Sequence, residues 1–222
     1  MTLFRLDAII RREGSVSREV ADTVQRSWLE RHPHDAVIHR DLGASPFPAD
    51  AWPRAVSTSF VSEDEQTAEQ RAALTLTSRL ADEVLGADAL LISTPLYNYG
   101  ISQHLKTWID LLCIDPRFVP GPNPLAGKPV TLVVARGGGY GPGTPKEGWD
   151  HATPYLERMF GESFGGDVTV VAAELTLADV NPAMADLRGL AAESKARAHE
   201  LAAETGRAHA ERAAAGSLTG VA

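Results

Sequence analysis

The sequence of 222 residues predicts a single α/β domain: a doubly wound, five-stranded parallel sheet of order 2-1-3-4-5 with helices on both faces. Two observations support this prediction. Apolar runs and helical segments alternate five times along the chain. Runs such as residues 89–92 and 130–134 are apolar at consecutive positions, as in strands covered on both faces. We expect residues 1–205 to form this domain and residues 206–222 to form a frayed tail.

The first half of the chain is expected to hold two strands, two helices and one irregular segment. Val20, Val24 and Trp28 mark one face of the first helix, and Gly86 ends the second. The second strand is less apolar than the others and is therefore expected near an edge of the sheet. The strands are residues 3–10 and 36–40, the helices residues 17–31 and 62–85, and the Pro-containing irregular segment residues 41–60.

The second half is organised around residues 89–112. An apolar strand ends at Thr94 and Pro95, a short loop follows over residues 96–100, and a helix begins at once. Its apolar side chains recur with a period of 3.6 residues. The remaining expected elements are a Pro-rich loop over residues 115–124, a strand over 130–134, a glycine loop over 135–143, a helix over 149–160, a strand over 167–173 and a helix over 182–203.

Composition and charge exclude several functions. The formal net charge of −8 argues against nucleic acid or an anionic membrane as the main partner. Cys113 is the single cysteine, so an intrachain disulfide is excluded. The first residues lack the features of a signal peptide, no apolar run approaches the length of a membrane span, and no set of metal ligands stands out. We therefore expect a cytoplasmic protein without a metal site.

Three loops that follow the first, third and fourth strands carry unusual chemistry, and the carboxyl ends of parallel strands meet at one edge of the sheet. Ser15 and Ser17 precede a helix, so they either bind a phosphate group or simply cap the helix. Tyr97, Asn98 and Tyr99 suit a flat heteroaromatic ligand edged with hydrogen-bonding atoms, and packing of the two rings in a turn is the alternative.

The third of these loops contains three successive glycines after Arg136. Glycines let the backbone approach a flat ligand closely, although a flexible crossover has the same composition. The Arg136 side chain either stabilises negative charge on a ligand or forms a surface ion pair. The sequence has no P-loop, which disfavours ATP hydrolysis, and no nucleophile elbow.

Taken together, the three loops resemble those of the FMN-dependent NAD(P)H:quinone oxidoreductase and azoreductase family, which has a flavodoxin-like fold. Residues 94–106, TPLYNYGISQHLK, are similar to the family pattern P-[ML]-Y-N-[FY]-x-[IV]-S/P-x-x-L-K. Residues 136–138 match its R-G-G loop, and residues 15–17 match its S-x-S phosphate loop. The resemblance covers nearly the whole chain and implies a homodimer that reduces quinones or azo compounds by ping-pong hydride transfer from NADH or NADPH.

The resemblance also implies roles for individual residues. One group would hold the FMN phosphate, a second would run along the isoalloxazine ring, and a third would meet its pyrimidine end. No residue need be a covalent catalyst. Tyr140 and Phe118 are candidate substrate contacts, and Phe118 would reach into the pocket of the partner subunit. The three groups are Ser15, Val16 and Ser17; Pro95, Leu96, Tyr97, Asn98 and Tyr99; and Ala135, Arg136, Gly137 and Gly138.

One position departs from the family pattern. Relatives often carry a serine two residues after the position of Asp7, and this chain has Ile9 there. A lost hydrogen bond to a charged phosphate costs about 1.5–3 kcal/mol, or about ten- to a hundredfold in affinity. Two alternatives therefore stay open: a flavodoxin-like electron carrier that uses no nicotinamide, and a biosynthetic or regulatory accessory protein with weakened or lost FMN binding.

Overall fold

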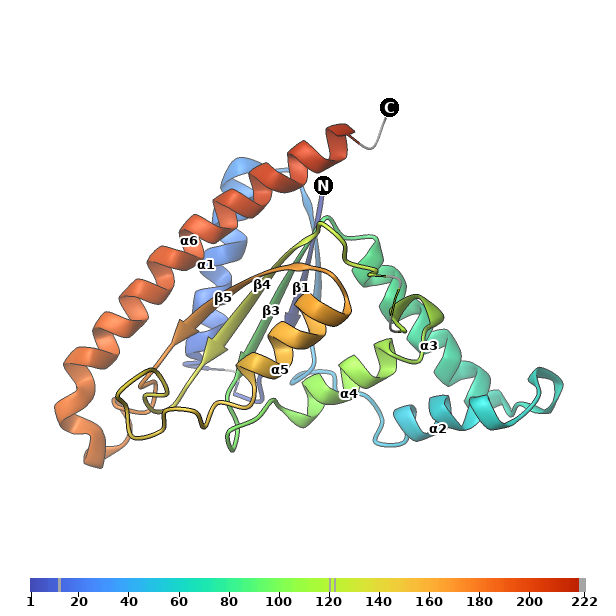
Figure 1. Cartoon of the computed structure of the whole chain (residues 1–222), viewed down its shortest axis with the longest axis horizontal. Coiled ribbons are helices and arrows are strands. Elements are labelled where there is room, and N and C mark those ends of the chain that lie inside the picture. The colour runs from blue at the N-terminus through green and yellow to red at the C-terminus, as the bar shows by residue number, and fades with distance from the viewer. Residues whose placement is uncertain (12, 120, 122, 220–222) are drawn as a thin grey trace.

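The computed structural model of the chain describes residues 1–11, 13–119, 121 and 123–219. All strand pairs in the sheet are parallel, and the five strands have the order β2-β1-β3-β4-β5, which confirms the predicted topology (Figure 1). The less apolar β2 is an edge strand, as expected. The strands are β1 Thr2–Asp7, β2 Ala36–Asp41, β3 Ala89–Pro95, β4 Pro129–Ala135 and β5 Asp167–Ala173.

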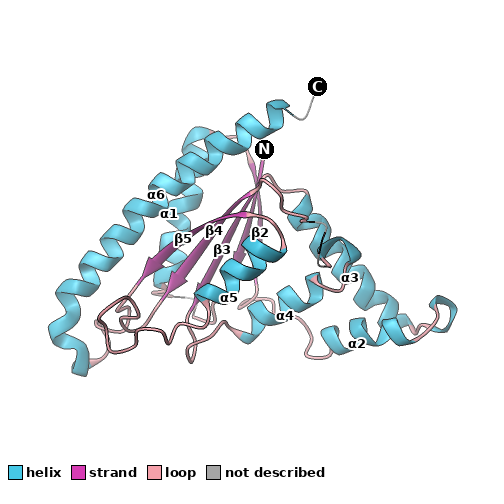
Figure 2. Cartoon of the chain, viewed as in Figure 1, coloured by secondary structure: helices cyan, strands magenta, loops and turns pink. Residues whose placement is uncertain are grey.

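Helices cover both faces of the sheet (Figures 1 and 2). On one face α1, Val16–Arg31, packs beside α6, Arg188–Thr219. The other face carries α2 Ala51–Ser57, α3 Ala68–Leu85, α4 Gln103–Leu112 and α5 Thr153–Glu157, the last continuing as a π-helical turn over Arg158–Ser163. Short 3-10 segments are Thr58–Phe60, Glu63–Glu65, Pro116–Phe118 and Pro182–Leu187.

The central strands pack against apolar side chains on both faces, which explains the consecutive apolar residues in runs such as 89–92 and 132–135. Toward α1, Leu91 and Trp28 belong to one buried cluster. Toward α4, the rings of Phe4 and Trp108 stack with centroids 5.9 Å apart, and Trp108 stacks on Phe160 at 6.2 Å. Alternate residues of each strand therefore contribute to two separate cores. Within the described residues, no helix combines the length and the hydropathy needed to span a bilayer.

Helix boundaries differ from the prediction where local capping decides them. The helix expected over residues 62–85 begins at Ala68, because Thr67 accepts a hydrogen bond from the Gln70 N–H and the Gln70 side chain accepts one from the Thr67 N–H. Residues 41–60 are less irregular than expected, since they contain α2. The helix expected from residue 149 begins at Thr153, after Asp150 has accepted hydrogen bonds from the next turn.

The prediction of a frayed tail from residue 206 is wrong for the described residues, because α6 continues to Thr219. Gly206 lies against α1 so closely that a Cβ there would collide with the Val24 carbonyl. The His209 ring is hydrogen-bonded to Thr131 and Thr169 on the sheet, and burial lowers its pKa to about 4. These long-range contacts hold the tail helical. Residues 220–222 of the expected tail lie outside the described residues.

Candidate functional site

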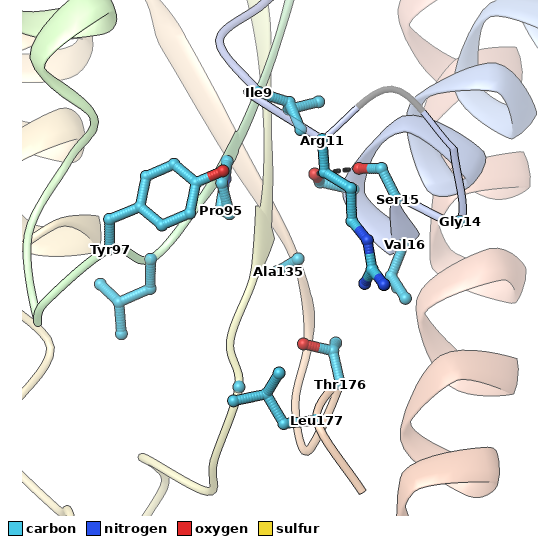
Figure 3. Close-up of a pocket in the computed structure, with 13 residues that line it drawn as sticks. Ile9, Arg11, Gly14, Ser15, Val16, Pro95, Tyr97, Ala135, Thr176 and Leu177 are labelled. Carbon is cyan, nitrogen blue, oxygen red and sulfur yellow. Dashed lines mark hydrogen bonds between the residues drawn. The ribbon is translucent and has the colours of Figure 1, made fainter. Parts of the chain in front are cut away.

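The cleft lies at the carboxyl ends of β1, β3 and β4, where the sheet order reverses. A cavity of about 200 Å³ occupies it, and the side chains of the first two loops face each other across this cavity (Figure 3). The structure therefore brings the predicted phosphate loop and the predicted aromatic loop together. The lining residues are Ile9, Arg11, Gly14, Ser15, Val16, Ser17, Pro95, Leu96, Tyr97, Ala135, Gly137, Thr176 and Leu177.

One end of the cleft, here called the phosphate end, is formed by residues 14–17 at the N-terminus of α1. Ser15 is the N-cap, and its Oγ accepts a hydrogen bond from the Arg18 N–H at 3.4 Å. The hydroxyls of Ser15 and Ser17 lie 3.3 Å apart and both residues are buried. The first turn leaves the N–H groups of Val16 and Ser17 without an intrahelical acceptor, and the helix dipole favours an anion there. This end therefore offers hydroxyl and N–H donors of the kind that a phosphate group needs.

A buried carboxylate organises the phosphate end from below. Asp7 is fully buried at the end of β1 and accepts hydrogen bonds from Arg5, Ser93 and Arg18, with the Arg18 guanidinium at 2.8 Å and the Ser93 hydroxyl at 2.7 Å. Its Oδ2 also lies 2.9 Å from His39 Nε2. Burial alone would raise the pKa of Asp7, but the His39 hydrogen bond, the Arg5 charge and the Ser93 hydrogen bond outweigh burial and lower this pKa to about 2. Asp7 thus stays ionised and ties α1 to β1 and β3.

Ile9, Arg11 and Arg18 determine which further hydrogen-bond donors and positive charges the phosphate end presents to a ligand. Ile9 lines the cavity and is buried, so an apolar side chain stands where a hydroxyl would add a donor. Arg18 is already paired with Asp7 and Asp41, so its charge is satisfied within the protein. Arg11 also lines the cavity, and its exposed guanidinium extends beside Val16 (Figure 3). Among the described residues that line this cavity, Arg11 is therefore the cation available to a bound anion.

The other end of the cleft, here called the ring end, is a second cavity of about 320 Å³. Leu96, Gly137 and Leu177 line both cavities, so the two adjoin at these residues. Tyr97 and Gly100 exchange two backbone hydrogen bonds, at 3.0 and 2.9 Å, which close a tight turn. The other lining residues of the ring end are Asn98, Tyr99, Gly138, Tyr140, Lys146, Asn181 and Met184.

The turn at the ring end holds two residues in an uncommon conformation. Asn98 and Tyr99 have φ values of 48° and 69°, in the left-handed region that few residues other than glycine adopt. The turn presents Asn98 and Tyr99 to the second cavity, while Tyr97 faces the first. The Tyr97 hydroxyl accepts a hydrogen bond from the Ile10 N–H at 3.4 Å. The three predicted ring contacts of this turn therefore divide between the two cavities.

The loop after β5 contributes residues that the sequence analysis did not identify. The Leu177 N–H donates to the Gly137 carbonyl at 3.3 Å, and the Thr176 N–H donates to the Arg136 carbonyl at 3.0 Å. A Cβ at Gly137 would lie 2.7 Å from Leu177 Cδ1, so the Leu177 side chain packs directly on the Gly137 backbone. The predicted topology could have indicated these residues, because the parallel strand β5 ends at the same edge of the sheet as β4.

Arg136 does not occupy the position predicted for its side chain. Its guanidinium forms ion pairs with Asp150 at 2.8 Å and Glu174 at 2.9 Å, and it donates a hydrogen bond to the Thr153 hydroxyl at 2.9 Å. The side chain lines neither cavity of the cleft. Two carboxylates already neutralise its charge, so the interpretation as a structural ion pair holds. Arg136 ties the glycine loop to α5 and to the end of β5.

The two candidate substrate contacts differ in outcome. Tyr140 lines the ring end, and its ring meets that of Tyr99 edge to face with centroids 6.4 Å apart. Phe118 is 1% exposed and packs against Phe164, with ring centroids 5.1 Å apart. A ring buried in the core of its own chain cannot reach a substrate, so the prediction for Phe118 is wrong. The Pro-rich loop folds inward at this residue because Pro116–Phe118 forms a 3-10 turn.

The cleft as a whole fits FMN at both ends. Hydroxyls and helix N–H groups suit a phosphate, and Gly137 and Gly138 line the cleft without side chains of their own, with Leu177 packed on Gly137. Backbone groups and the Asn98 amide supply donors and acceptors for polar ring edges. Ile9 lines the phosphate end with an apolar side chain and therefore offers no hydrogen-bond donor to a phosphate. The residues therefore fit FMN, with one hydroxyl donor fewer around the phosphate than a serine at position 9 would give.

Comparison with known proteins agrees with this geometry. A model of the family with the flavodoxin-like fold matches residues 1–199. An FMN-dependent NADH:quinone oxidoreductase from Frankia casuarinae is 40% identical over 199 residues, covering 88% of this chain and 94% of the relative. One of the same name from Streptomyces avermitilis is 39% identical over 219 residues, covering 96% and 99%.

A solved structure gives the same result. The azoreductase from Bacillus anthracis str. Sterne superimposes with a TM-score of 0.75 at 25% identity, covering 93% of this chain and 98% of the other. The sheet order and the position of the cleft place the chain among proteins with the flavodoxin-like fold. More specifically, the chain belongs to the family of the FMN-dependent NADH:quinone oxidoreductases.

Proposed function

We propose that this protein is an FMN-dependent NAD(P)H oxidoreductase that passes two electrons to quinones or azo compounds by a ping-pong mechanism. One observation carries the proposal: the Ser15–Ser17 helix terminus and the Tyr97–Tyr99 turn line two adjoining cavities at one edge of the sheet. The two features suit the two chemically different ends of FMN. The names of the relatives, which are FMN-dependent NADH:quinone oxidoreductases and an azoreductase, support the same activity.

The residues of the phosphate end would bind the cofactor without supplying much net charge. Ser15 and Ser17 would donate their hydroxyls to the phosphate, together with the N–H groups of Val16 and Ser17. Asp7 holds these donors in place through Arg18, since Arg18 is the fourth residue of the same turn. Arg11 would add the positive charge that Arg18, already paired, cannot offer.

The residues of the ring end would orient the reacting groups. Pro95, Leu96 and Tyr97 would lie along the ring, and Asn98 with the Gly137–Gly138 backbone would bond its polar edge. Bound FMN supplies the hydride chemistry, as acceptor from NADH or NADPH and donor to the second substrate. The protein's own contribution is positioning and electrostatic preorganisation.

The size of the ring end supports the proposed alternation of substrates. Its cavity of about 320 Å³ is lined by Leu177, Tyr99 and Tyr140, among other residues. With the ring of FMN against the Tyr97 turn, the space beside Tyr140 would take one flat ligand at a time. The oxidised nicotinamide would therefore leave before the acceptor enters, which is the ping-pong order. Tyr140 is the residue placed to touch both ligands.

A second candidate function rests on Ile9. With an apolar side chain in place of a hydroxyl, the phosphate end holds one donor fewer. If the remaining donors are too few to hold FMN, the protein would act instead as an accessory protein without a working flavin; if FMN binds but no nicotinamide reduces it, the protein would act as an electron carrier. Titration with FMN separates the candidates.

The test begins with the FMN-free protein, titrated with FMN and followed by flavin fluorescence. We expect saturable binding, bleaching of the flavin by NADH or NADPH without oxygen, and recovery of colour when a quinone or an azo dye is added. Ser17→Ala should weaken binding about tenfold, because it removes a hydrogen bond to a charged group. Ser27→Ala, which alters another buried serine of α1 away from the cleft, is the matched control.

Two further outcomes decide between the functions. Tyr97→Ala combined with Asn98→Ala should abolish quinone reduction, and unchanged turnover would count against the oxidoreductase. Saturable FMN binding without reduction by either nicotinamide would favour the electron carrier. Failure of FMN to bind at millimolar concentration would favour the accessory protein and overturn the proposal.

We also propose that two copies of the chain associate next to the ring end. Large apolar side chains are exposed around that cavity: Trp149 is 53%, Leu177 47% and Leu190 52% exposed. Burial of such side chains against a second copy would be favourable. Light scattering of the protein in solution should give about twice the chain mass of 23.7 kDa, and a mass near 23.7 kDa would contradict the dimer. A cytoplasmic location stays a prediction from the sequence.

A further inference from the structure

A lysine at the ring end has no role in the function proposed so far. The Lys146 Nζ lies 5.4 Å from the centroid of the Tyr99 ring and 5.6 Å from that of Tyr140. Both distances are within the range of cation–π attraction. Two aromatic rings therefore lie beside the ammonium group, and Trp149 meets the Tyr99 ring edge to face at 5.2 Å. Lys146 itself is half-buried and lines the cavity.

The nearest carboxylates are engaged elsewhere. Asp150 and Glu174 both pair with Arg136, and Glu147 accepts a hydrogen bond from the Gly143 N–H at 2.8 Å. Within the described part of the chain, Lys146 has no carboxylate within ion-pair distance. The ammonium group therefore faces the cavity without a counter-ion, in a protein whose net charge is −8.

We propose that Lys146 selects aromatic acceptors that carry an acidic group, such as a sulfonate or a carboxylate. This inference rests on the proposed function, since it names the substrate class of the same cleft. The aromatic part of the acceptor would pack among Tyr99, Tyr140 and the flat wall of the cleft, and its acidic group would pair with the Lys146 ammonium. A charge-assisted contact in this half-buried position is worth more than a fully exposed pair.

The first test measures binding without turnover. The FMN-loaded protein is titrated calorimetrically with naphthalene-2-sulfonate and with the uncharged naphthalene-2-sulfonamide, neither of which is a quinone or an azo compound. In Lys146→Met, we expect the dissociation constant for the sulfonate to rise about five- to tenfold and that for the sulfonamide to stay the same. Lys146→Arg should keep most of the preference, because it keeps the charge. Arg158→Met, which removes an exposed charge outside both cavities, controls for net charge.

The second test measures turnover with 1,2-naphthoquinone-4-sulfonate and with 1,4-naphthoquinone. For each quinone the Lys146→Met value of kcat/KM is divided by that of the unmodified protein, so differences in redox potential between the quinones cancel. We expect a ratio of about 0.1 to 0.2 for the sulfonated quinone and near 1 for the neutral one. High salt should narrow the difference.

Two outcomes would overturn the proposal. Equal ratios for the charged and neutral compounds would show that Lys146 does not read acceptor charge. Slower flavin reduction by NADH in Lys146→Met, with both acceptor ratios unchanged, would assign the lysine to the dinucleotide instead. If the protein reduces no quinone at all, the proposed function fails, yet the calorimetric comparison still measures the charge preference of the cavity.

Discussion

The two ends of the cleft are held in place by opposite kinds of charge network. A carboxylate is the centre at the phosphate end, where Asp7 is fully buried and contacts Arg5 and Arg18. A guanidinium is the centre at the ring end, where Arg136 is 15% exposed and contacts Asp150 and Glu174. The first network joins regular elements, β1, β3 and α1, whereas the second joins loops.

This difference separates anchoring from selection. The phosphate end presents backbone N–H groups and buried hydroxyls on a helix terminus, so its donors are fixed before any ligand arrives. The ring end presents a left-handed turn, half-buried aromatic rings and the unpaired Lys146, which can accommodate different flat ligands. A cofactor needs the first kind of site, and a series of acceptors needs the second.

The largest effect should come from Asp7→Asn. The change leaves Arg5 buried beside a neutral amide, and the loss of one partner from a buried ion pair costs about 3 kcal/mol or more of the free energy of unfolding. Because Arg18 also loses a partner, FMN binding should weaken as well. Urea denaturation followed by tryptophan fluorescence measures the first effect, and FMN titration the second.

Asp41→Asn is the control for this variant, since Asp41 pairs with the same Arg18 but is 24% exposed. We expect a loss below about 1 kcal/mol. The pKa of Asp7 is lowered from 3.8 to about 2, so its stabilisation is complete above about pH 4 and lost as the pH falls toward 2. The Asn variant should lack this pH dependence. A similar pH profile in both proteins would show that Asp7 does not anchor this end.

Arg136→Met should have the next largest effect, about 2 kcal/mol, because Asp150 and Glu174 would be left without a cation while only 12% and 23% exposed. The damage should stay local. Proteolysis within residues 137–150 should become faster, while the FMN phosphate contacts remain. Glu174→Gln, which keeps the Asp150 pair, should lose less stability. Equal losses for Arg136→Met and Asp7→Asn would remove the distinction between the two ends.

Contacts within one segment were predictable from the sequence, and contacts between distant segments were not. The apolar runs located the strands, their five-fold alternation with helices favoured the order 2-1-3-4-5, and hydroxyls before a helix indicated the phosphate end. Arg136 was ambiguous because its partner Glu174 lies 38 residues away. Phe118 was misplaced because its burial depends on Phe164.

The C-terminal helix shows the same limit. Alanines and polar residues from residue 206 onward give no strong periodic pattern, so the sequence favoured a frayed tail. His209 decides the outcome through Thr131 and Thr169, which lie on β4 and β5. The sequence did not predict residues 146, 176 and 177 as part of the cleft for a related reason. Their loops have no motif, and only the sheet brings them to the same edge.

Ile9→Ser would sharpen the comparison by strengthening the phosphate end alone. A hydroxyl at this cavity-lining position should tighten FMN binding about tenfold, because it adds a hydrogen bond to a charged group. Ile9→Ala, which shortens the side chain without adding a donor, is the control for lost packing. Fluorescence titration of both variants gives the comparison. If both bind FMN alike, the hydroxyl is not what this end lacks.

The smallest effect should come from Arg11→Gln. Arg11 is exposed beside the phosphate end, so the solvent screens its attraction for a bound phosphate, and the dissociation constant of FMN should rise only about threefold. The difference should disappear in high salt, whereas that caused by Ser17→Ala should persist, since buried hydroxyls are not screened. Riboflavin, which lacks the phosphate, should bind both Arg11 forms equally. A threefold loss with riboflavin as well would place Arg11 against the ring rather than the phosphate, and the division of the cleft into two ends would need to be redrawn.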